Sequence, residues 1–236
     1  MFEAPSGKTN HSVSVSQPAT GLSTTFEVAA TNFERLSTGF PRLSRATEQT
    51  CHHRTMLIVV SGLPGTGKSA LAVGIGQALG AVVLSVDPIE AALLESGIER
   101  SFATGYAAYR VVSTLAEANL PLGQTLIVDA VSSVAEAKAW WPVLAADAGV
   151  DLAVIECICS DSRLHRSRLA GRVRGLGSFP EPSWEEVERR REEWAPWTTD
   201  HLVLDAIAPL ESNVAKALAY VAESADNKTP KGTSLP

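Results

Sequence analysis

Apolar residues along the chain gather in short runs that alternate with longer amphipathic segments. Five runs rich in Val, Ile and Leu predict β-strands, at 56–60 (MLIVV), 82–86 (VVLSV), 125–129 (TLIVD), 152–158 (LAVIECI) and 201–205 (HLVLD). Most are apolar at successive positions, which is typical of strands buried on both faces of a parallel sheet. Helical patterns fill the intervals, at 68–79, 88–97, 102–118, 134–147, 162–173, 184–194 and 211–223. This alternation predicts a three-layer α/β/α sandwich that binds ligands at the carboxyl ends of its strands.

Three local signals refine the helix boundaries. Ser133 followed by Glu136 predicts a capping box at the start of the fourth helix. Pro88 behind Asp87 suits the first position of the second helix, with Asp87 as its N-cap. Pro142 is expected to kink its helix or to end it early.

The two ends of the chain do not follow the strand and helix pattern. Residues 1–55 contain 16 Ser or Thr and predict a disordered leader, with a short helix around 26–36. Met56 opens the first strand and is a candidate for the biological start. A transit peptide is the alternative, but four glutamates against five basic residues argue against it. The folded domain is expected at 56–223, and 224–236 as a disordered tail.

Composition narrows the class of protein. The 236 residues are 45% hydrophobic and 19% charged, which fits one sizeable globular domain. No apolar run approaches the ~18 residues that span a bilayer, and the N-terminus lacks a secretory pattern. The three cysteines, Cys51, Cys157 and Cys159, make a poor disulfide framework. These features favour a cytoplasmic protein without a membrane partner, as a monomer or homodimer.

Charge bears on the class of partner. The chain has 20 Lys and Arg against 26 Asp and Glu, and removal of residues 1–55 leaves 15 against 22, a net charge of −7. Because binding to nucleic acid depends on neutralising phosphates, so acidic a domain makes nucleic acid an unlikely partner.

The glycine-rich segment after the first strand carries the clearest chemistry. It fits the P-loop pattern G-x-x-x-x-G-K-S/T in full, between a predicted strand and a predicted helix. Glycines let backbone N–H groups turn toward an anion at the positive end of a helix. Lys68 adds charge for the β- and γ-phosphates, and the Ser69 hydroxyl can bind Mg²⁺. A glycine-rich turn without a ligand is the less favoured alternative. The predicted nucleotide-binding residues are Gly62, Leu63, Pro64, Gly65, Thr66, Gly67, Lys68, Ser69 and Ala70.

The third strand adds a second metal ligand. Asp129 ends the run TLIVD, where a Walker-B carboxylate would lie near Mg²⁺, so Ser69 and Asp129 are the predicted metal ligands. Ala130 follows, where a motor-type ATPase usually carries a glutamate, and this predicts slow hydrolysis. No N-K-x-D guanine signature is present, so ATP is the expected nucleotide.

Two further features indicate transfer of a phosphoryl group to an acceptor. Asp87 ends the second strand, where it either caps the next helix or accepts the proton of an acceptor hydroxyl. The stretch SRLHRSRLAGRVRG holds five arginines and no acid. Arg168 and Arg172 are four apart on one predicted helix face, and they suggest a lid that closes over ATP. A solvated helix is the alternative.

These motifs resemble the AAA-33-type group of P-loop kinases, which is similar to zeta toxins, chloramphenicol phosphotransferase and polynucleotide 5′-kinases. The resemblance covers about residues 56–222 and rests on the loop, on SVD, on GQTLIVDAV and on LHRSRLAGR. It implies the P-loop NTPase fold with a five-stranded parallel sheet in the order 2-3-1-4-5. It assigns acceptor activation to Asp87 and lid roles to Arg172 and Arg168, within a lid at about 163–183, and nucleotide contacts to residues around 206–210.

The leading hypothesis is therefore an ATP- and Mg²⁺-dependent kinase that transfers the γ-phosphate to a hydroxyl of a small molecule, with Lys68, Asp87, Arg168 and Arg172 as catalytic residues. One alternative is a polynucleotide or nucleoside 5′-kinase, which the arginines favour and the net charge opposes. The other is a nucleotide-binding switch or toxin-like regulator without phosphotransfer. Glu90, Tyr106 and Tyr109 are candidates for the acceptor pocket, although exposure of Glu90 and packing of the tyrosines are favoured.

Overall fold

A computed structural model describes residues 54–177 and 179–226 of the chain. All of these residues belong to one compact unit, which begins at His52. The predicted disordered leader and its short helix lie outside the described residues, apart from residues 54 and 55. So does the predicted tail from residue 227 onward.

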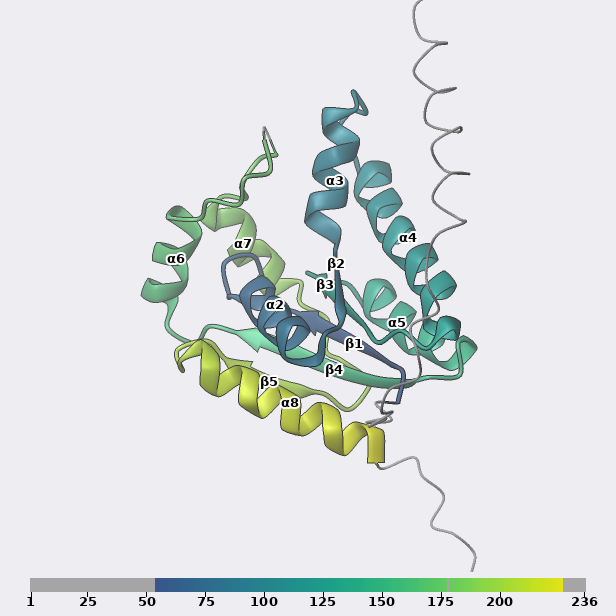
Figure 1. Ribbon diagram of the computed structural model, residues 1–236. Coiled ribbons are helices and arrows are strands. Elements are labelled where there is room, and N and C mark those ends of the chain that lie inside the picture. Colours follow the sequence, from purple (N-terminus) through teal and green to yellow (C-terminus); the bar gives the residue numbers. More distant parts are fainter. Residues whose placement is uncertain (1–53, 178, 227–236) are drawn as a thin grey trace, which may run out of the picture. The chain divides into compact units, whose positions relative to one another are not determined.

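One parallel sheet forms the centre of this unit, and its strand order β2-β3-β1-β4-β5 confirms the predicted order (Figure 1). The strands are β1 (Met56–Ser61), β2 (Val82–Ser85), β3 (Leu126–Ala130), β4 (Asp151–Ile158) and β5 (Leu202–Asp205). Every residue of β1 is buried, as its unbroken apolar run predicts. The register sets Asp129 of β3 between Val60 of β1 and Ser85 of β2.

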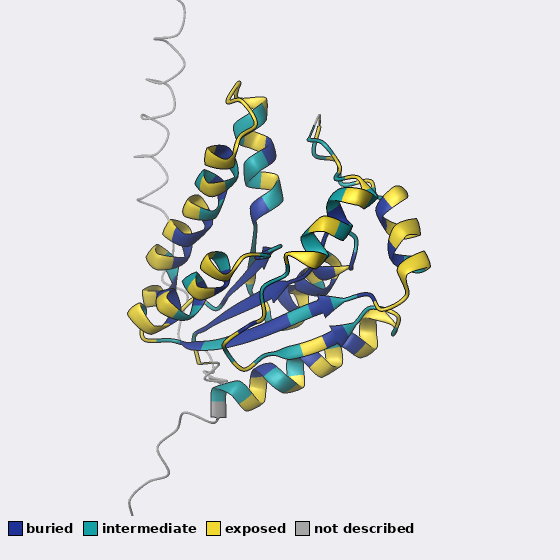
Figure 2. Ribbon diagram, turned by 180° about the vertical axis from the view of Figure 1, so that it is seen from behind, coloured by how far each residue is buried: buried dark blue, intermediate teal, exposed yellow. Residues whose placement is uncertain are grey.

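Helices cover both faces of the sheet and give the predicted three layers (Figure 1). They are α2 (Lys68–Leu79), α3 (Val86–Glu95), α4 (Phe102–Asn119), α5 (Ala135–Asp147), α6 (Ser162–Ala170), α7 (Trp184–Glu192) and α8 (Leu210–Asp226), with a 3₁₀ turn η1 (Leu120–Leu122) after α4. Alternate residues of β1 enter the two cores. Leu57 and Val59 pack with α4 and α5, whereas Ile58 and Val60 pack with α2 and α8. Figure 2 shows the strands largely buried and the outer helix faces exposed.

The start of α5 corrects one predicted cap. Its N-cap residue is Val134, and no side chain caps it, so the predicted capping box of Ser133 and Glu136 is wrong. The Ser133 carbonyl instead accepts a hydrogen bond from the Ala195 N–H at 3.0 Å, which ties this turn to a distant segment. A capping box does form at α7, from Ser183 and Glu186.

The start of α3 corrects the role of Asp87 as a helix cap. The helix begins at Val86, with Ser85 in the N-cap position, so Asp87 is its second residue and Pro88 its third. The Ser85 hydroxyl donates to Asp129 Oδ2 at 3.0 Å rather than to the helix. Pro88 is tolerated because the first turn of a helix needs no N–H donor.

Pro142 does not end α5 early, because the helix continues to its predicted end at Asp147. Two other helix ends differ from the prediction by three residues. The helix α6 ends at Ala170, three residues before its predicted end, and α8 runs to Asp226, three residues beyond. No helix within the described residues is both long enough and apolar enough to cross a bilayer.

Candidate active site

The phosphate loop joins β1 to α2, and its backbone takes conformations that favour glycine, most clearly at its two ends. Gly62 has φ 154°, and a Cβ atom there would overlap the carbonyl oxygen of Cys157 in β4. Gly67 has φ 94° and ends the loop in the left-handed region, immediately before α2. Because other residues rarely adopt these conformations, the two glycines fix the path of the loop.

Lys68 opens α2 beneath this loop. Lys68 is only 2% exposed. No carboxylate of the described residues lies within salt-bridge distance of its ammonium group. A buried cation without an acidic partner is costly unless an anion binds it. The site therefore favours an anion at the start of α2, where the helix dipole also attracts negative charge.

Asp129 provides a carboxylate oxygen that suits a metal. The residue is 6% exposed, and its Oδ2 accepts the hydrogen bond from Ser85. Its Oδ1 is buried without a hydrogen-bond partner within the described residues. Mg²⁺ prefers oxygen ligands, usually one or two from protein together with substrate phosphates. The unpartnered Asp129 Oδ1 suits this ion, and the described residues hold no cluster of three or more His, Cys, Asp or Glu that could hold a metal.

Asp87 lies in the first turn of α3, which follows directly after β2. Two arginines from the segment after α6 contact its carboxylate. Arg174 Nη1 donates to Asp87 Oδ2 at 2.5 Å, and Arg172 Nη2 lies 3.8 Å from the same oxygen. Both arginines also contact Glu181, at 2.6 Å from Arg174 and 3.4 Å from Arg172. The hydrogen bond and both ion pairs of Asp87 with described residues use Oδ2, which leaves Oδ1 as the oxygen that could accept a proton.

The predicted pairing of Arg168 with Arg172 on one helix face is wrong. Because α6 ends at Ala170, Arg172 lies beyond the helix, and the extended chain after Gly171 brings Arg174 to Asp87. Arg168 Nη1 instead donates to the Ala206 carbonyl at 2.9 Å, in the turn after β5. A Cβ atom on Gly67 would lie 3.8 Å from the Ala206 side chain, so this turn flanks the phosphate loop.

Two of the candidates for the acceptor pocket, Glu90 and Tyr109, have different surroundings. Glu90 is half-buried, and burial together with the nearby Asp87 carboxylate raises the pKa of its carboxyl group. Tyr109 is engaged elsewhere, because its hydroxyl accepts the Ser132 N–H at 2.9 Å and burial raises its pKa. Ser132 has φ 47° in the loop after β3, so Tyr109 holds a strained turn next to Asp129.

His165, to which the sequence assigned no role, is hydrogen-bonded to the phosphate loop. His165 of α6 is fully buried, with Nε2 2.8 Å from the Pro64 carbonyl and Nδ1 3.0 Å from Arg191 Nη2. A carbonyl needs a donor and a guanidinium needs an acceptor, so the ring is neutral with its proton on Nε2. Burial lowers the pKa of His165, which agrees with a neutral ring.

Glu181 was also missed, and one signal in the sequence points to it. The segment from Ser162 to Gly175 has five arginines and no acid, and Glu181 is the first acid that follows it. An unbalanced run of cations indicates a distant carboxylate partner. The sequence does not, however, indicate that Asp87 is the other partner, because 87 positions separate it from Arg174.

Known proteins resemble this chain in sequence or in fold. A family model described as an AAA domain, AAA_33, matches residues 57–194. The uncharacterized protein Rv2004c of Mycobacterium tuberculosis is 30% identical over 185 residues, which are 73% of this chain and 36% of that protein. The chain thus spans about a third of the length of the curated relatives that it matches.

Solved structures of kinases resemble the fold at lower identity. A sugar kinase from Janibacter sp. HTCC2649 superposes with a TM-score of 0.55 at 18% identity, over 71% of this chain and 95% of that one. The APS kinase CysC of Mycobacterium tuberculosis, in complex with AMPPNP and APS, gives 0.53 at 22% identity, over 72% and 99%. These likenesses show the fold.

Proposed function

The chain belongs to the AAA_33 family of AAA domains, and from this membership and its site we propose that it is an ATP-dependent kinase that phosphorylates a hydroxyl group of a small molecule. The observation that carries the proposal is the position of Asp87. Its carboxylate follows β2, beside the Ser85 and Asp129 pair of the metal site, and it keeps one oxygen free.

The phosphate loop and Lys68 would bind the triphosphate. Backbone N–H groups of Gly65 to Ser69 lie at the positive end of α2, and none of the described acidic residues pairs with Lys68 in competition with phosphate. Ser69 and Asp129 Oδ1 would hold Mg²⁺, which supplies positive charge for the phosphate oxygens. Arg168 and the turn after β5 would contact the nucleoside, because their mutual hydrogen bond lies beside Gly67.

Asp87 would act as the general base in the transfer. Its free Oδ1 takes the proton of the acceptor hydroxyl. The acceptor oxygen forms a bond to the γ-phosphorus, and the bond between that phosphorus and the bridging oxygen of ATP breaks, so that ADP leaves. Arg172 and Arg174 lie next to Asp87, and there they can neutralise the charge on the transferred group.

The remaining parts of the proposal concern partners and compartment. The net charge of −7 for the chain after residue 55 supports a small molecule rather than nucleic acid as the acceptor. The domain would act as a monomer or homodimer. Cys157 and Cys159 are buried and free, which suits the reducing cytoplasm that we propose as the compartment.

Release of ADP on addition of acceptor tests this function. Pools of sugars, aminoglycoside-like antibiotics, nucleosides and amino-sugar nucleotides would be incubated with the protein, ATP and Mg²⁺. We expect one pool to accelerate ADP release, and Lys68→Ala to abolish that acceleration. ATP binding without acceptor-dependent ADP release across all pools would favour a nucleotide-binding switch instead.

A further inference from the structure

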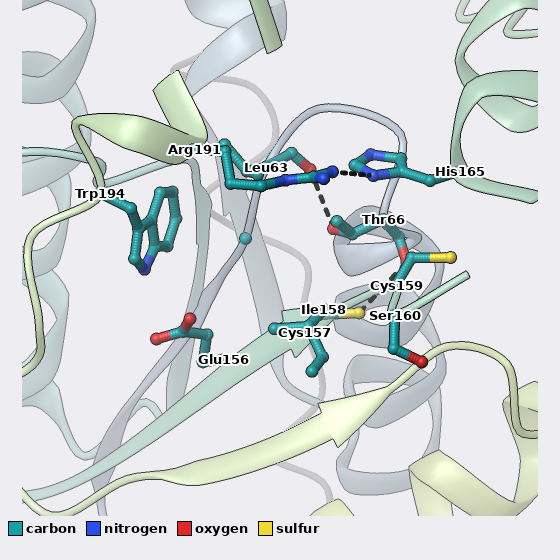
Figure 3. A pocket seen from close by; sticks show the side chains of 11 residues that line it. Leu63, Thr66, Glu156, Cys157, Ile158, Cys159, Ser160, His165, Arg191 and Trp194 are labelled. Atoms are coloured by element: carbon teal, nitrogen blue, oxygen red, sulfur yellow. Dashed lines mark hydrogen bonds between the residues drawn. The ribbon is translucent and has the colours of Figure 1, made fainter. Parts of the chain in front are cut away.

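A cavity of about 300 Å³ lies beside the phosphate loop, at the carboxyl end of β4 (Figure 3). The residues that matter for its chemistry are Leu63, Thr66, Glu156, His165, Arg191 and Trp194. The predicted catalytic and metal-binding residues Lys68, Ser69, Asp87 and Asp129 are absent from its walls, whereas Gly62, Leu63 and Thr66 of the predicted nucleotide-binding loop line it. This rear cavity is therefore separate from the predicted catalytic groups, although it shares the loop as a wall.

Two polar residues line the rear cavity, and one of them has a buried group without a hydrogen-bond partner within the described residues. The indole nitrogen of Trp194 is buried and has no hydrogen-bond partner within the described residues. Glu156 has a side chain that is 14% exposed, and its Oε2 lies 3.9 Å from both Lys138 Nζ and His201 Nε2. These ion pairs are too long for hydrogen bonds, and the carboxylate accepts no hydrogen bond from the described residues. Figure 3 shows the indole nitrogen on the side of the ring that faces the Glu156 carboxylate. A donor and an acceptor thus face the same space.

Unpaired buried polar groups are rare in folded proteins, because each loses its hydrogen bonds to water. A hydroxyl group would satisfy both, since it can donate to a carboxylate and accept from an N–H. The other charges around the cavity are balanced. Arg191 contacts Glu188 at 3.1 Å and donates to His165, while the Lys138 ammonium lies 4.1 Å from the centre of the Trp194 ring. These contacts favour an uncharged ligand over an ion.

We propose that the rear cavity is a second small-molecule site, which binds a neutral polyhydroxylated ligand through Glu156 and Trp194. Its volume lies near the lower end of the range for ligand pockets and suits a molecule of hexose size. Residues of the cavity wall are also connected to the phosphate loop by hydrogen bonds. Arg191 donates to His165, and His165 donates to the Pro64 carbonyl. A ligand in the cavity would therefore lie against the outer side of the phosphate-binding turn.

The test follows the indole N–H resonances of the full chain by ¹⁵N NMR. The Trp194 resonance is assigned by its loss in Trp194→Phe, and the probes are D-glucose, myo-inositol and glycerol. We expect at least one probe to shift that resonance saturably, with a dissociation constant on the order of millimolar for so small a ligand. Glu156→Gln should weaken the binding about tenfold or more, because it removes the charged acceptor.

Two control variants make the test specific. Glu193→Gln changes an exposed carboxylate next to Trp194 and should leave the binding unchanged. Lys68→Ala should also leave it unchanged, so the result is independent of ATP binding and phosphotransfer. The proposal is wrong if none of the three probes shifts the Trp194 resonance, or if Glu156→Gln binds the probe as tightly as the natural protein does.

Discussion

Lys68 and Arg174 are two cations at the same edge of the sheet, yet their surroundings differ. Lys68 is buried at the start of α2 without an acidic partner among the described residues, and it faces the turn that predicts a phosphate site. Arg174 already contacts two carboxylates, those of Asp87 and Glu181. Lys68 can therefore bind the anion of a ligand, whereas Arg174 is neutralised by carboxylates of the protein.

The difference shows how local and long-range sequence information build the site. Eight consecutive residues, Gly62 to Ser69, and the helix that follows set the surroundings of Lys68. The surroundings of Arg174 depend on residues 87 positions earlier and 7 positions later. For Arg174 to assist transfer, it must exchange part of its contact with Asp87 for contact with phosphate. For Lys68, no such exchange is needed.

The largest effect is expected for Lys68→Ala. Because Lys68 is the buried cation of the phosphate loop, its loss should lower ATP affinity about 100-fold or more, and acceptor-dependent ADP release should vanish. Isothermal titration with ATP and Mg²⁺ measures the affinity. Lys216→Ala, an exposed position on α8, is the matched control and should bind ATP normally. A Lys68→Ala protein that binds ATP within threefold of the natural protein would contradict the role of this lysine.

Asp87→Asn should affect turnover and not ATP binding. Loss of a general base should lower kcat about 10²- to 10³-fold, while the dissociation constant of ATP stays nearly the same. Steady-state kinetics and calorimetry on the same sample separate the two quantities.

Glu181→Gln is the control for Asp87→Asn, because it removes a carboxylate from the same two arginines without removing the base. We expect its kcat to fall by less than about tenfold, because Glu181 is exposed and its two ion pairs with the arginines are weakened by solvent. Equal losses in the two variants would mean that Asp87 acts by holding the arginines and not as a base.

Gly62→Ala should destabilise the loop that surrounds Lys68. A Cβ atom at this position overlaps the Cys157 carbonyl, and φ is 154°. Forcing the backbone apart should cost about 2–4 kcal/mol in the free energy of unfolding, measured by urea denaturation. Gly149→Ala has a positive φ of 67° but no atom near its Cβ position, so its cost should be only about 1 kcal/mol. Similar costs for both would show that the close approach to β4 is not what fixes the loop.

Lys138 is a third cation with different surroundings, since it is buried and lies over two aromatic rings. Burial lowers its pKa to about 8, while its ammonium group lies 4.1 Å from the centre of the Trp194 ring and 4.8 Å from that of Trp197. Below pH 8 the Lys138 side chain is charged although it is buried, and this lowers the stability of the folded protein. Because the unfolded chain holds its proton up to about pH 10.5, the free energy of unfolding should rise with pH between these values.

The measurement for Lys138 is the urea midpoint between pH 7 and 10, for the natural protein and for Lys138→Met. Other groups titrate in both proteins, so the difference between the two isolates Lys138. We expect the natural protein to gain stability relative to Lys138→Met as the pH rises through 8. A difference that is constant or falls over this range would refute the lowered pKa.

Sequence patterns predicted the fold and the phosphate loop well, because these depend on local or repetitive signals. The five apolar runs each became a strand within one residue of its predicted start, and α2 has the predicted bounds. The order of the strands came from the resemblance to a family and was also confirmed. The loop positions follow from a full motif in its required context.

The acceptor side was predicted less well, because tertiary contacts decide it. The spacing of Arg168 and Arg172 would align them only if α6 continued, and the helix ends at Ala170. Ser133 does not cap α5, since its carbonyl serves a contact with Ala195, 62 positions later. Neither the partners of Arg174 nor the neutral His165 under Pro64 can be derived from neighbouring residues.

The most direct measurement is a crystal structure with a non-hydrolysable ATP analogue and Mg²⁺. We expect the β- and γ-phosphates within hydrogen-bond distance of the backbone amides between Gly65 and Ser69, with Lys68 Nζ on the phosphate oxygens and the metal between Ser69 and Asp129. An analogue bound elsewhere, with the loop collapsed or filled by its own side chains, would contradict the account.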